Sequence, residues 1–140
     1  MKVNIEEYTD DGEDQVVEVH IDRWDTWSMD YTLAHIVLPM LRQLKETKHG
    51  SPEVDDADVP EELRSTSAPP KEKEYDIDDN WHKRWDWAMS EMIYAFDCKV
   101  NRDEVYMRFD AGDRAGMEKE QDRISNGFRL FGKYYEALWD

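Results

Sequence analysis

Large apolar side chains recur at spacings of three and four residues in three long segments of this 140-residue chain, and this period is the strongest constraint on its fold. The first segment runs from Arg23 to Gly50, the second from about Asn80 to Lys99, and the third from about Met117 to the end. A stripe with this spacing lies along one side of an α-helix and has to be buried against another element. The spacing therefore predicts three main helices packed round one core.

The expected stripes are Leu33, Ile36, Val37, Met40, Leu41 and Leu44 in the first helix, Trp81, Trp85, Ala88, Met89, Met92, Ile93 and Phe96 in the second, and Ile124, Phe128, Phe131, Tyr135 and Leu138 in the third. Pro39 lies inside the first helix, where its missing amide hydrogen should kink the helix or split it. Gly127 and Gly132 each weaken the third helix by about 1 kcal/mol relative to Ala. Their presence predicts a close approach between helices.

The start of the chain predicts a β-hairpin. Residues 2–8 and 16–21 are rich in β-branched side chains, and Asp11-Gly12 between them is a turn signal. We expect the apolar residues of this hairpin to face inward, namely Val3, Ile5, Val17, Val19 and Ile21. The piece 105–112 is predicted to be a short strand or loop. The fold class is therefore α+β and helix-dominated, with an N-terminal hairpin packed with three main helices in a single domain, 1–140.

Residues 50–79 differ in composition, with many Pro, Ser, Asp and Glu residues and few large apolar ones. We interpret 53–79 as a long acidic surface loop, partly mobile, with one helical turn at Pro60–Leu63 and the least order at Ser65–Glu74. Asp55, Asp56 and Asp58 lack the spacing of a calcium-binding loop and are predicted to be solvated.

The charge balance excludes some classes of function. The chain has 34 acidic and 18 basic residues, a net charge of −16. Direct nucleic-acid binding needs many Lys and Arg side chains, so it is not expected. Six Trp, seven Tyr and four Phe residues argue against disorder. The only cysteine, Cys98, excludes an internal disulfide. No apolar run is long enough for a membrane helix, and the acidic start does not resemble a signal peptide.

Catalytic and metal-binding patterns are missing from the sequence. The histidines, His20, His35, His49 and His82, fall in no metal-ligand spacing, and the chain has no glycine-rich phosphate loop and no nucleophile motif. Cys98 is interpreted as a half-buried thiol. The prediction is a non-enzymatic protein without metal or cofactor.

Tryptophans and scarce basic residues provide the candidate ligand-binding set: Trp24, Trp27, Arg42, Lys45, His49, Arg84 and Trp87. Indoles can stack on bases, and Arg or Lys can pair with phosphates. A structural interpretation stands beside this one. Cations at a helix C-terminus complement its dipole, and Trp87, which lies about 160° round the helix from Trp85, can pack under the long loop or against the hairpin. Alternatively, Trp87 lies in a dimer interface or a pocket.

Three blocks resemble a family of small acidic proteins found in tailed-phage genomes. They are WDTWSMDYTLAHIVLPMLRQLKETKHGSP at 24–52, RWDWAMSEMIYAF at 84–96 and ISNGFRLFGKYYEALWD at 124–140. The resemblance implies a phage origin and a location in the host cytoplasm. A small accessory phage protein without catalytic motifs is most often a binder that acts on host machinery or host defence.

These observations lead to three hypotheses. In the first, the protein forms a homo-oligomer and acts in counter-defence by sequestering a small cyclic nucleotide signal. In the second, its acidic surface mimics nucleic acid and inhibits a host protein that binds DNA or RNA. In the third, it is a virion or assembly component with exposed aromatic residues at a protein interface. The nucleotide hypothesis is ranked slightly ahead because it also explains the tryptophans and basic clusters.

Overall fold

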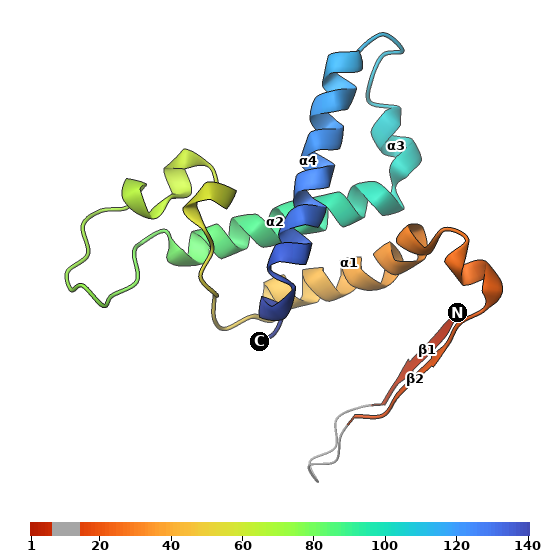
Figure 1. Cartoon of the computed structure of the whole chain (residues 1–140), viewed down its shortest axis with the longest axis horizontal. Coiled ribbons are helices and arrows are strands. Elements are labelled where there is room, and N and C mark those ends of the chain that lie inside the picture. Colours follow the sequence, from red (N-terminus) through yellow and green to blue (C-terminus); the bar gives the residue numbers. More distant parts are fainter. Residues whose placement is uncertain (7–14) are drawn as a thin grey trace. The chain divides into compact units, whose positions relative to one another are not determined.

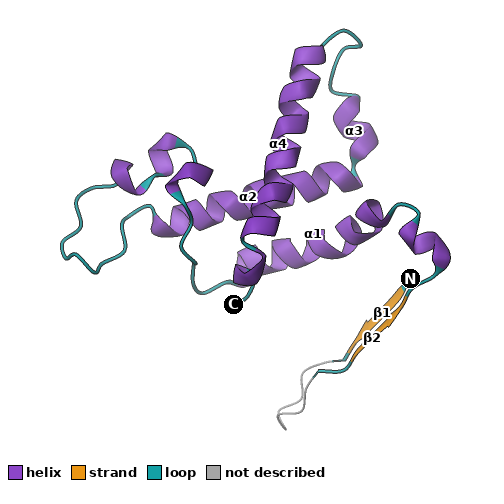
Figure 2. Cartoon of the chain, viewed as in Figure 1, coloured by secondary structure: helices purple, strands orange, loops and turns teal. Residues whose placement is uncertain are grey.

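The computed structural model describes residues 1–6 and 15–140, which form two compact units, Met1–Leu33 and Ala34–Asp140. In chain order, the strands and helices are β1 (Lys2–Ile5), β2 (Val17–His20), α1 (Met29–Thr47), α2 (Trp81–Val100), α3 (Arg102–Tyr106) and α4 (Arg114–Lys133), joined by 3₁₀ turns at Arg23–Thr26, Asp56–Asp58, Glu61–Leu63, Ser65–Ser67 and Tyr135–Ala137 (Figures 1 and 2). The helix-dominated α+β class with an N-terminal hairpin is confirmed.

In the first unit, β1 and β2 form an antiparallel pair in which Val3 lies opposite Val19 and Ile5 opposite Val17. Asp11-Gly12, the predicted turn, lies outside the described residues. The 3₁₀ turn after the strands begins with a capping box: Asp22 accepts from the Trp24 amide, and the Asp25 carboxylate accepts from the Asp22 amide.

The expectation that the hairpin's apolar side chains face a core is wrong. Every residue of both strands is exposed, and Val3, Ile5, Val17, Val19 and Ile21 retain between 42% and 54% of their accessible surface. A two-stranded sheet cannot cover either of its own faces, so alternation in the sequence marks an apolar face without ensuring its burial.

The core of the second unit lies where α4 packs across α2 (Figure 1). The buried members of the α2 stripe are Trp85, Ala88, Met89, Met92 and Phe96, as the spacing predicts. From α4, Leu130 is completely buried, and Phe128 and Phe131 meet the Phe96 ring edge-on at centroid distances of 5.0 and 4.9 Å. The α2 prediction is confirmed to within a residue at each end.

Gly127 makes the close contact between α2 and α4 possible. A Cβ atom added there would lie 2.4 Å from the Glu91 carbonyl oxygen and 2.6 Å from the Ala95 Cβ atom. Only glycine allows the two backbones to approach this closely. The prediction of close helix approach therefore holds at Gly127. It is wrong at Gly132, where a Cβ atom would meet nothing within 4 Å.

Helix α1 continues through Pro39, so the proline does not split it. The buried residues on α1 are Ala34, Leu38 and Leu41. Of the predicted stripe, Leu33 and Met40 are instead exposed, at 42% and 61%. The buried face is thus rotated from the predicted one, because spacing alone does not say which edge of a broad apolar stripe meets a neighbour.

Two further segments differ from expectation. Residues 102–106, which overlap the predicted strand or loop, form the short helix α3. The segment 53–79 contributes to the core, since Val54 and Val59 are 3% and 5% exposed. Asp58 is also buried, in contrast to the solvated position expected for it. The predicted turn near Pro60–Leu63 is present as the 3₁₀ turn Glu61–Leu63.

Candidate binding groove

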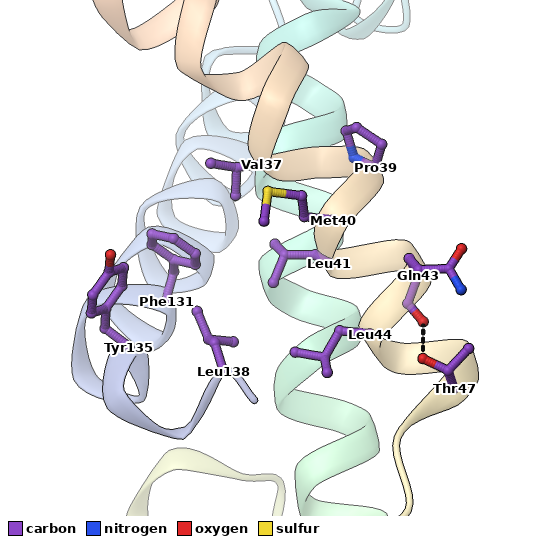
Figure 3. A pocket seen from close by; sticks show the side chains of 10 residues that line it. All are labelled: Val37, Pro39, Met40, Leu41, Gln43, Leu44, Thr47, Phe131, Tyr135 and Leu138. Carbon is purple, nitrogen blue, oxygen red and sulfur yellow. Dashed lines mark hydrogen bonds between the residues drawn. The ribbon is translucent and has the colours of Figure 1, made fainter. Parts of the chain in front are cut away.

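An apolar groove opens on the second unit between α1 and the C-terminal part of the chain. It encloses about 780 Å³ and is lined by Val37, Pro39, Met40, Leu41, Gln43, Leu44, Thr47, Phe131, Tyr135 and Leu138. Figure 3 shows Met40, Leu41 and Leu44 directed toward the side that carries Phe131 and Leu138. The volume falls within the range of small-molecule and peptide sites.

The lining of this groove contains no Asp, Glu, His, Cys, Lys or Arg residue. Its polar residues are Gln43 and Thr47 at the edge, where the Thr47 hydroxyl donates to the Gln43 carbonyl oxygen at 2.9 Å (Figure 3). Tyr135 lines the groove and is 65% exposed. Such a surface can bury apolar groups of a partner, and its lining has no cation to pair with a phosphate.

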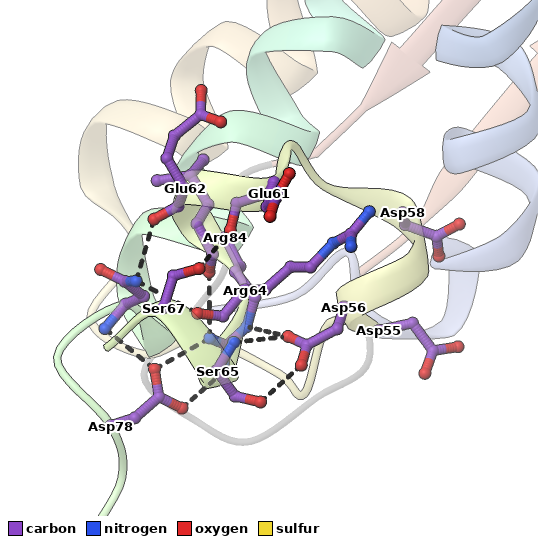
Figure 4. A network of polar contacts seen from close by, with 12 residues as sticks. Asp55, Asp56, Asp58, Glu61, Glu62, Arg64, Ser65, Ser67, Asp78 and Arg84 are labelled. Carbon is purple, nitrogen blue, oxygen red and sulfur yellow. Dashed lines mark hydrogen bonds and ion pairs between the residues drawn. The ribbon is translucent and has the colours of Figure 1, made fainter. Parts of the chain in front are cut away.

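Beside the N-terminal end of α2, a polar network fastens the segment 50–80 to the helix (Figure 4). Arg84 is 3% exposed and donates from both terminal nitrogens to the two Asp78 carboxylate oxygens, each at 2.8 Å. Its guanidinium also donates to the Leu63 carbonyl oxygen at 3.3 Å, and its Nε lies 4.0 Å from Asp56. The hydrogen bonds from Arg84 hold the pKa of Asp78 below its usual value.

Asp58 is the centre of a second network, which ties the same segment to α4. It accepts from Lys133 and from the Tyr134 hydroxyl at 2.6 Å each, and it pairs with Arg129 at 2.8 Å. Burial raises the pKa of Asp58, but these hydrogen bonds outweigh it, so the net pKa is lowered. The Tyr134 hydroxyl also accepts from the Asp55 amide. Both networks use polar residues to hold a segment that has few apolar ones.

A third polar cluster lies between α2 and α4. The Tyr94 hydroxyl donates to Glu120, and the Arg123 guanidinium lies 3.6 Å from the centroid of the Tyr94 ring while pairing with Glu91. Burial raises the pKa of Tyr94 to about 12 and also raises the pKa of Cys98. A thiol with a raised pKa is a poor nucleophile. The contacts of Tyr94 with Glu120 and of Arg123 with Glu91 connect α2 to α4.

The basic residues singled out from the sequence pair with other residues of the chain. Arg42 lies 2.5 Å from Asp97, Lys45 donates to Ser90, and His49 lies 2.9 Å from Asp140. Lys48, the residue before His49, lies 2.6 Å from Asp86. These contacts join the C-terminal half of α1 to α2 and to the end of the chain.

The structure does not bring Arg84 next to Arg42. Arg42 pairs with Asp97 near the C-terminal end of α2, whereas Arg84 lies near its N-terminal end. The thirteen positions from Arg84 to Asp97 correspond to about 20 Å along the helix axis. Trp87 is half-buried and packs against the core of the second unit. Trp24 and Trp27 belong to the first unit and are 68% and 81% exposed.

The spacing of apolar residues in the sequence predicts only part of the groove lining. The helical spacing predicts seven of the lining residues as members of a closed core, namely Val37, Met40, Leu41, Leu44, Phe131, Tyr135 and Leu138. Pro39, Gln43 and Thr47 carried no such signal.

Comparisons with family models, with curated proteins and with solved structures found no match for this chain. The resemblance to tailed-phage proteins therefore stays a prediction. Among the described residues, no group of His, Cys, Asp and Glu is arranged to hold a metal ion. None of the helices in that part of the chain has the length and apolar character needed to cross a membrane.

Acid is expected to destabilise the protein through these carboxylates. The pKa values of Asp56, Asp58 and Asp78 in the folded chain lie below their usual value, so the unfolded chain takes up protons first as the pH falls. Their contribution to stability is complete above about pH 5 and is lost progressively below about pH 4. Urea unfolding between pH 7 and pH 2.5 measures it.

In this titration the Asp78→Asn variant should lose less stability on acidification than the natural chain, because one of the responsible carboxylates is missing. Equal losses in the two proteins would contradict a role for Asp78 in the acid response.

Proposed function

We propose that this chain is a non-enzymatic binding protein whose groove takes an amphipathic helix with a basic polar face, presented by a partner protein. The observation that carries the proposal is the lining of the groove. Its α1 side is mostly apolar, and the polar Gln43 and Thr47 lie at its edge (Figure 3). A third helix laid there would bury its apolar side against α1 and the end of α4.

The dimensions of the groove support a helical occupant. The lining residues on α1 run from Val37 to Thr47, which is about 15 Å along the axis or roughly three helical turns. An amphipathic helix places an apolar side chain on one face at every third or fourth position, so three turns present about four apolar side chains. In the groove, Met40 and Tyr135 are 61% and 65% exposed, so they offer apolar surface that such side chains can cover.

Charge supports a basic partner. The net charge of the chain is −16, and the cations beside the groove already have acidic partners, Arg42 with Asp97 and Lys48 with Asp86. A partner with Lys and Arg on its outer face would be attracted by the remaining carboxylates. This argument concerns a protein partner, for example a host protein if the predicted phage origin is correct.

The nucleotide hypothesis stays a prediction that no contact in the second unit favours. Arg42, Lys45 and Arg84 each contact an acidic or hydroxyl side chain of the chain itself, and the groove has no cation in its lining. The nucleic-acid mimic and the virion component likewise stay predictions. Each of the three also describes a non-enzymatic binder, so they differ from the proposal in the partner.

A synthetic helical peptide tests the proposal. We would titrate the full chain with the amphipathic peptide LKKLLKLLKKLLKL by calorimetry, and with a peptide in which every Lys is replaced by Glu. We expect a one-to-one complex with the Lys peptide and at least tenfold weaker binding of the Glu peptide. Equal affinities would contradict the charge argument, and no binding of either peptide would overturn the proposal.

Matched variants locate the binding site. The double variant Met40→Ser/Tyr135→Ser removes two exposed groove side chains, and Met107→Ser/Tyr75→Ser removes the same types where they are 83% and 81% exposed outside the groove lining. We expect the groove variant to weaken binding of the Lys peptide at least tenfold, which corresponds to about 1.4 kcal/mol. The control should change the affinity less than twofold. Equal effects would show that the peptide binds elsewhere.

A further inference from the structure

The first unit has no interior among its described residues. None of residues 1–6 and 15–33 is buried. This unit nevertheless contains most of the exposed large apolar side chains of the described chain, namely Met1, Val3, Ile5, Val16, Val17, Val19, Ile21, Trp24, Trp27, Met29, Tyr31 and Leu33. An isolated two-stranded hairpin is marginally stable in water, so such a surface has to be covered to become stable.

The hairpin has one apolar face and one polar face. Directly opposite residues share a face, and the register pairs Val3 with Val19 and Ile5 with Val17. These four β-branched side chains therefore form one face with no charged group in it. The other face carries the opposite pairs of the register, which are Lys2 with His20 and Asn4 with Glu18.

The tryptophan turn is held to the hairpin by contacts within the first unit. The N-terminal ammonium group of Met1, which directly precedes β1, lies 2.5 Å from the Asp25 carboxylate in the turn. Trp24 and Trp27 flank Asp25, and their ring centroids are 5.8 Å apart. The same ion pair and the capping box at Asp22 give the turn a fixed conformation. Two exposed indoles thus have a defined place beside the strands.

We propose that the apolar hairpin face and the tryptophan turn together form a homodimer interface with a second copy of this chain. The face consists of Val3, Ile5, Val17 and Val19, and the turn adds the two indoles. Their exposed surface, with that of Met1 and Ile21, amounts to roughly 700–900 Å² per copy, estimated from the exposed fractions and typical side-chain areas. A stable dimer of standard size buries about 800 Å² on each partner.

The chemistry of the face also fits a second copy. A surface made of aliphatic and indole groups is complementary to itself, and two such faces related by a twofold axis can pack as two sheet layers. Lys2, Glu18 and His20 lie on the other face of the hairpin, so the packing would not bring these charges into contact across the interface. The net charge of −16 per copy weakens association at long range without entering the contact.

Sedimentation velocity of the full chain tests the dimer. At pH 8 and 0.15 M NaCl, between 1 and 100 µM, we expect the mass to rise from the monomer value of 16.7 kDa toward twice that value. Because salt screens the repulsion between two acidic copies, 0.5 M NaCl should strengthen the dimer severalfold. A mass that stays at 16.7 kDa at every concentration would overturn the proposal.

Two adjacent strand positions provide the matched variants. Val19→Asp and His20→Asp each add one negative charge at pH 8, on the apolar and the polar face respectively. We expect Val19→Asp to weaken the dimer at least thirtyfold and His20→Asp to change it less than threefold. Equal weakening by both would overturn the assignment of the face, since it would mean that added charge alone matters.

A second pair keeps the test independent of the strands. Trp27→Ala removes an indole that is 81% exposed in the proposed interface, and Trp139→Ala removes one that is 74% exposed in the second unit. We expect only Trp27→Ala to weaken the dimer, by at least tenfold. Neither variant changes a residue that lines the groove, so failure of the dimer and failure of peptide binding are separate results.

Discussion

Asp78→Asn is expected to lower the free energy of unfolding by about 3–5 kcal/mol, because it leaves the Arg84 guanidinium buried without its countercharge. Arg84 is 3% exposed and Asp78 6%, and the two are joined by a bidentate pair at 2.8 Å. Asp56 at 4.0 Å is too distant from Nε to replace the hydrogen bonds that are lost. Urea unfolding at pH 7, followed by tryptophan fluorescence, measures the change.

The neighbouring residue is the control for this experiment. Asp79 is exposed, so Asp79→Asn makes the same chemical change without removing a buried countercharge. We expect a change within about 0.5 kcal/mol for this variant. If Asp78→Asn and Asp79→Asn were equally stable, the Asp78–Arg84 pair would not hold the segment 50–80 on α2.

Gly127→Ala has the second large expected effect, a loss of about 2–3 kcal/mol, despite the higher helix propensity of Ala. The added methyl group would lie 2.4 Å from the Glu91 carbonyl oxygen and 2.6 Å from the Ala95 Cβ atom. The first of these atoms belongs to the α2 backbone, so the helices have to move apart, and overpacking of this kind typically costs 1–3 kcal/mol.

Gly132→Ala is the matched substitution in the same helix. Nothing lies within 4 Å of the added Cβ atom, and the position is helical, so the variant should gain up to about 1 kcal/mol. Chemical denaturation of both variants gives the comparison. Stabilisation by both substitutions would contradict the close α2–α4 contact at Gly127, and destabilisation by both would contradict the open space at Gly132.

The helices were predictable because their signal is local. The α2 stripe around Trp85 and Met92 repeats at the helical period, and five of its seven predicted members are buried on one face. The end of α4 was less predictable. Periodicity continues through Tyr135 and Leu138, but the α-helix ends at Lys133 and a 3₁₀ turn follows. The prediction that Tyr135 lies on the buried side is therefore wrong, because Tyr135 is 65% exposed and Tyr134 is buried in its place.

Contacts between distant residues were not predictable. Asp58 and Lys133 are 75 positions apart, and in a chain with 34 acidic residues nothing in the sequence singles out Asp58 or Asp78 as buried. The segment 53–79 was therefore interpreted as a surface loop, although Val54 and Val59 reach the core. The candidate groove was not predictable for the same reason. A groove is a space between elements, so helix spacing can supply its walls but not its opening.

The sequence by itself determined where the three long helices form and which strands pair in the hairpin, because periodicity and β-branched runs act over a few neighbouring positions. It also determined the acidic character of the surface. The tertiary structure decided which apolar residues are covered. Leu38 and Met40 lie two positions apart on α1, yet one is 5% exposed and the other 61%. Burial depends on a neighbour from elsewhere in the chain, and for Met40 and the hairpin face we propose that the neighbour belongs to another molecule.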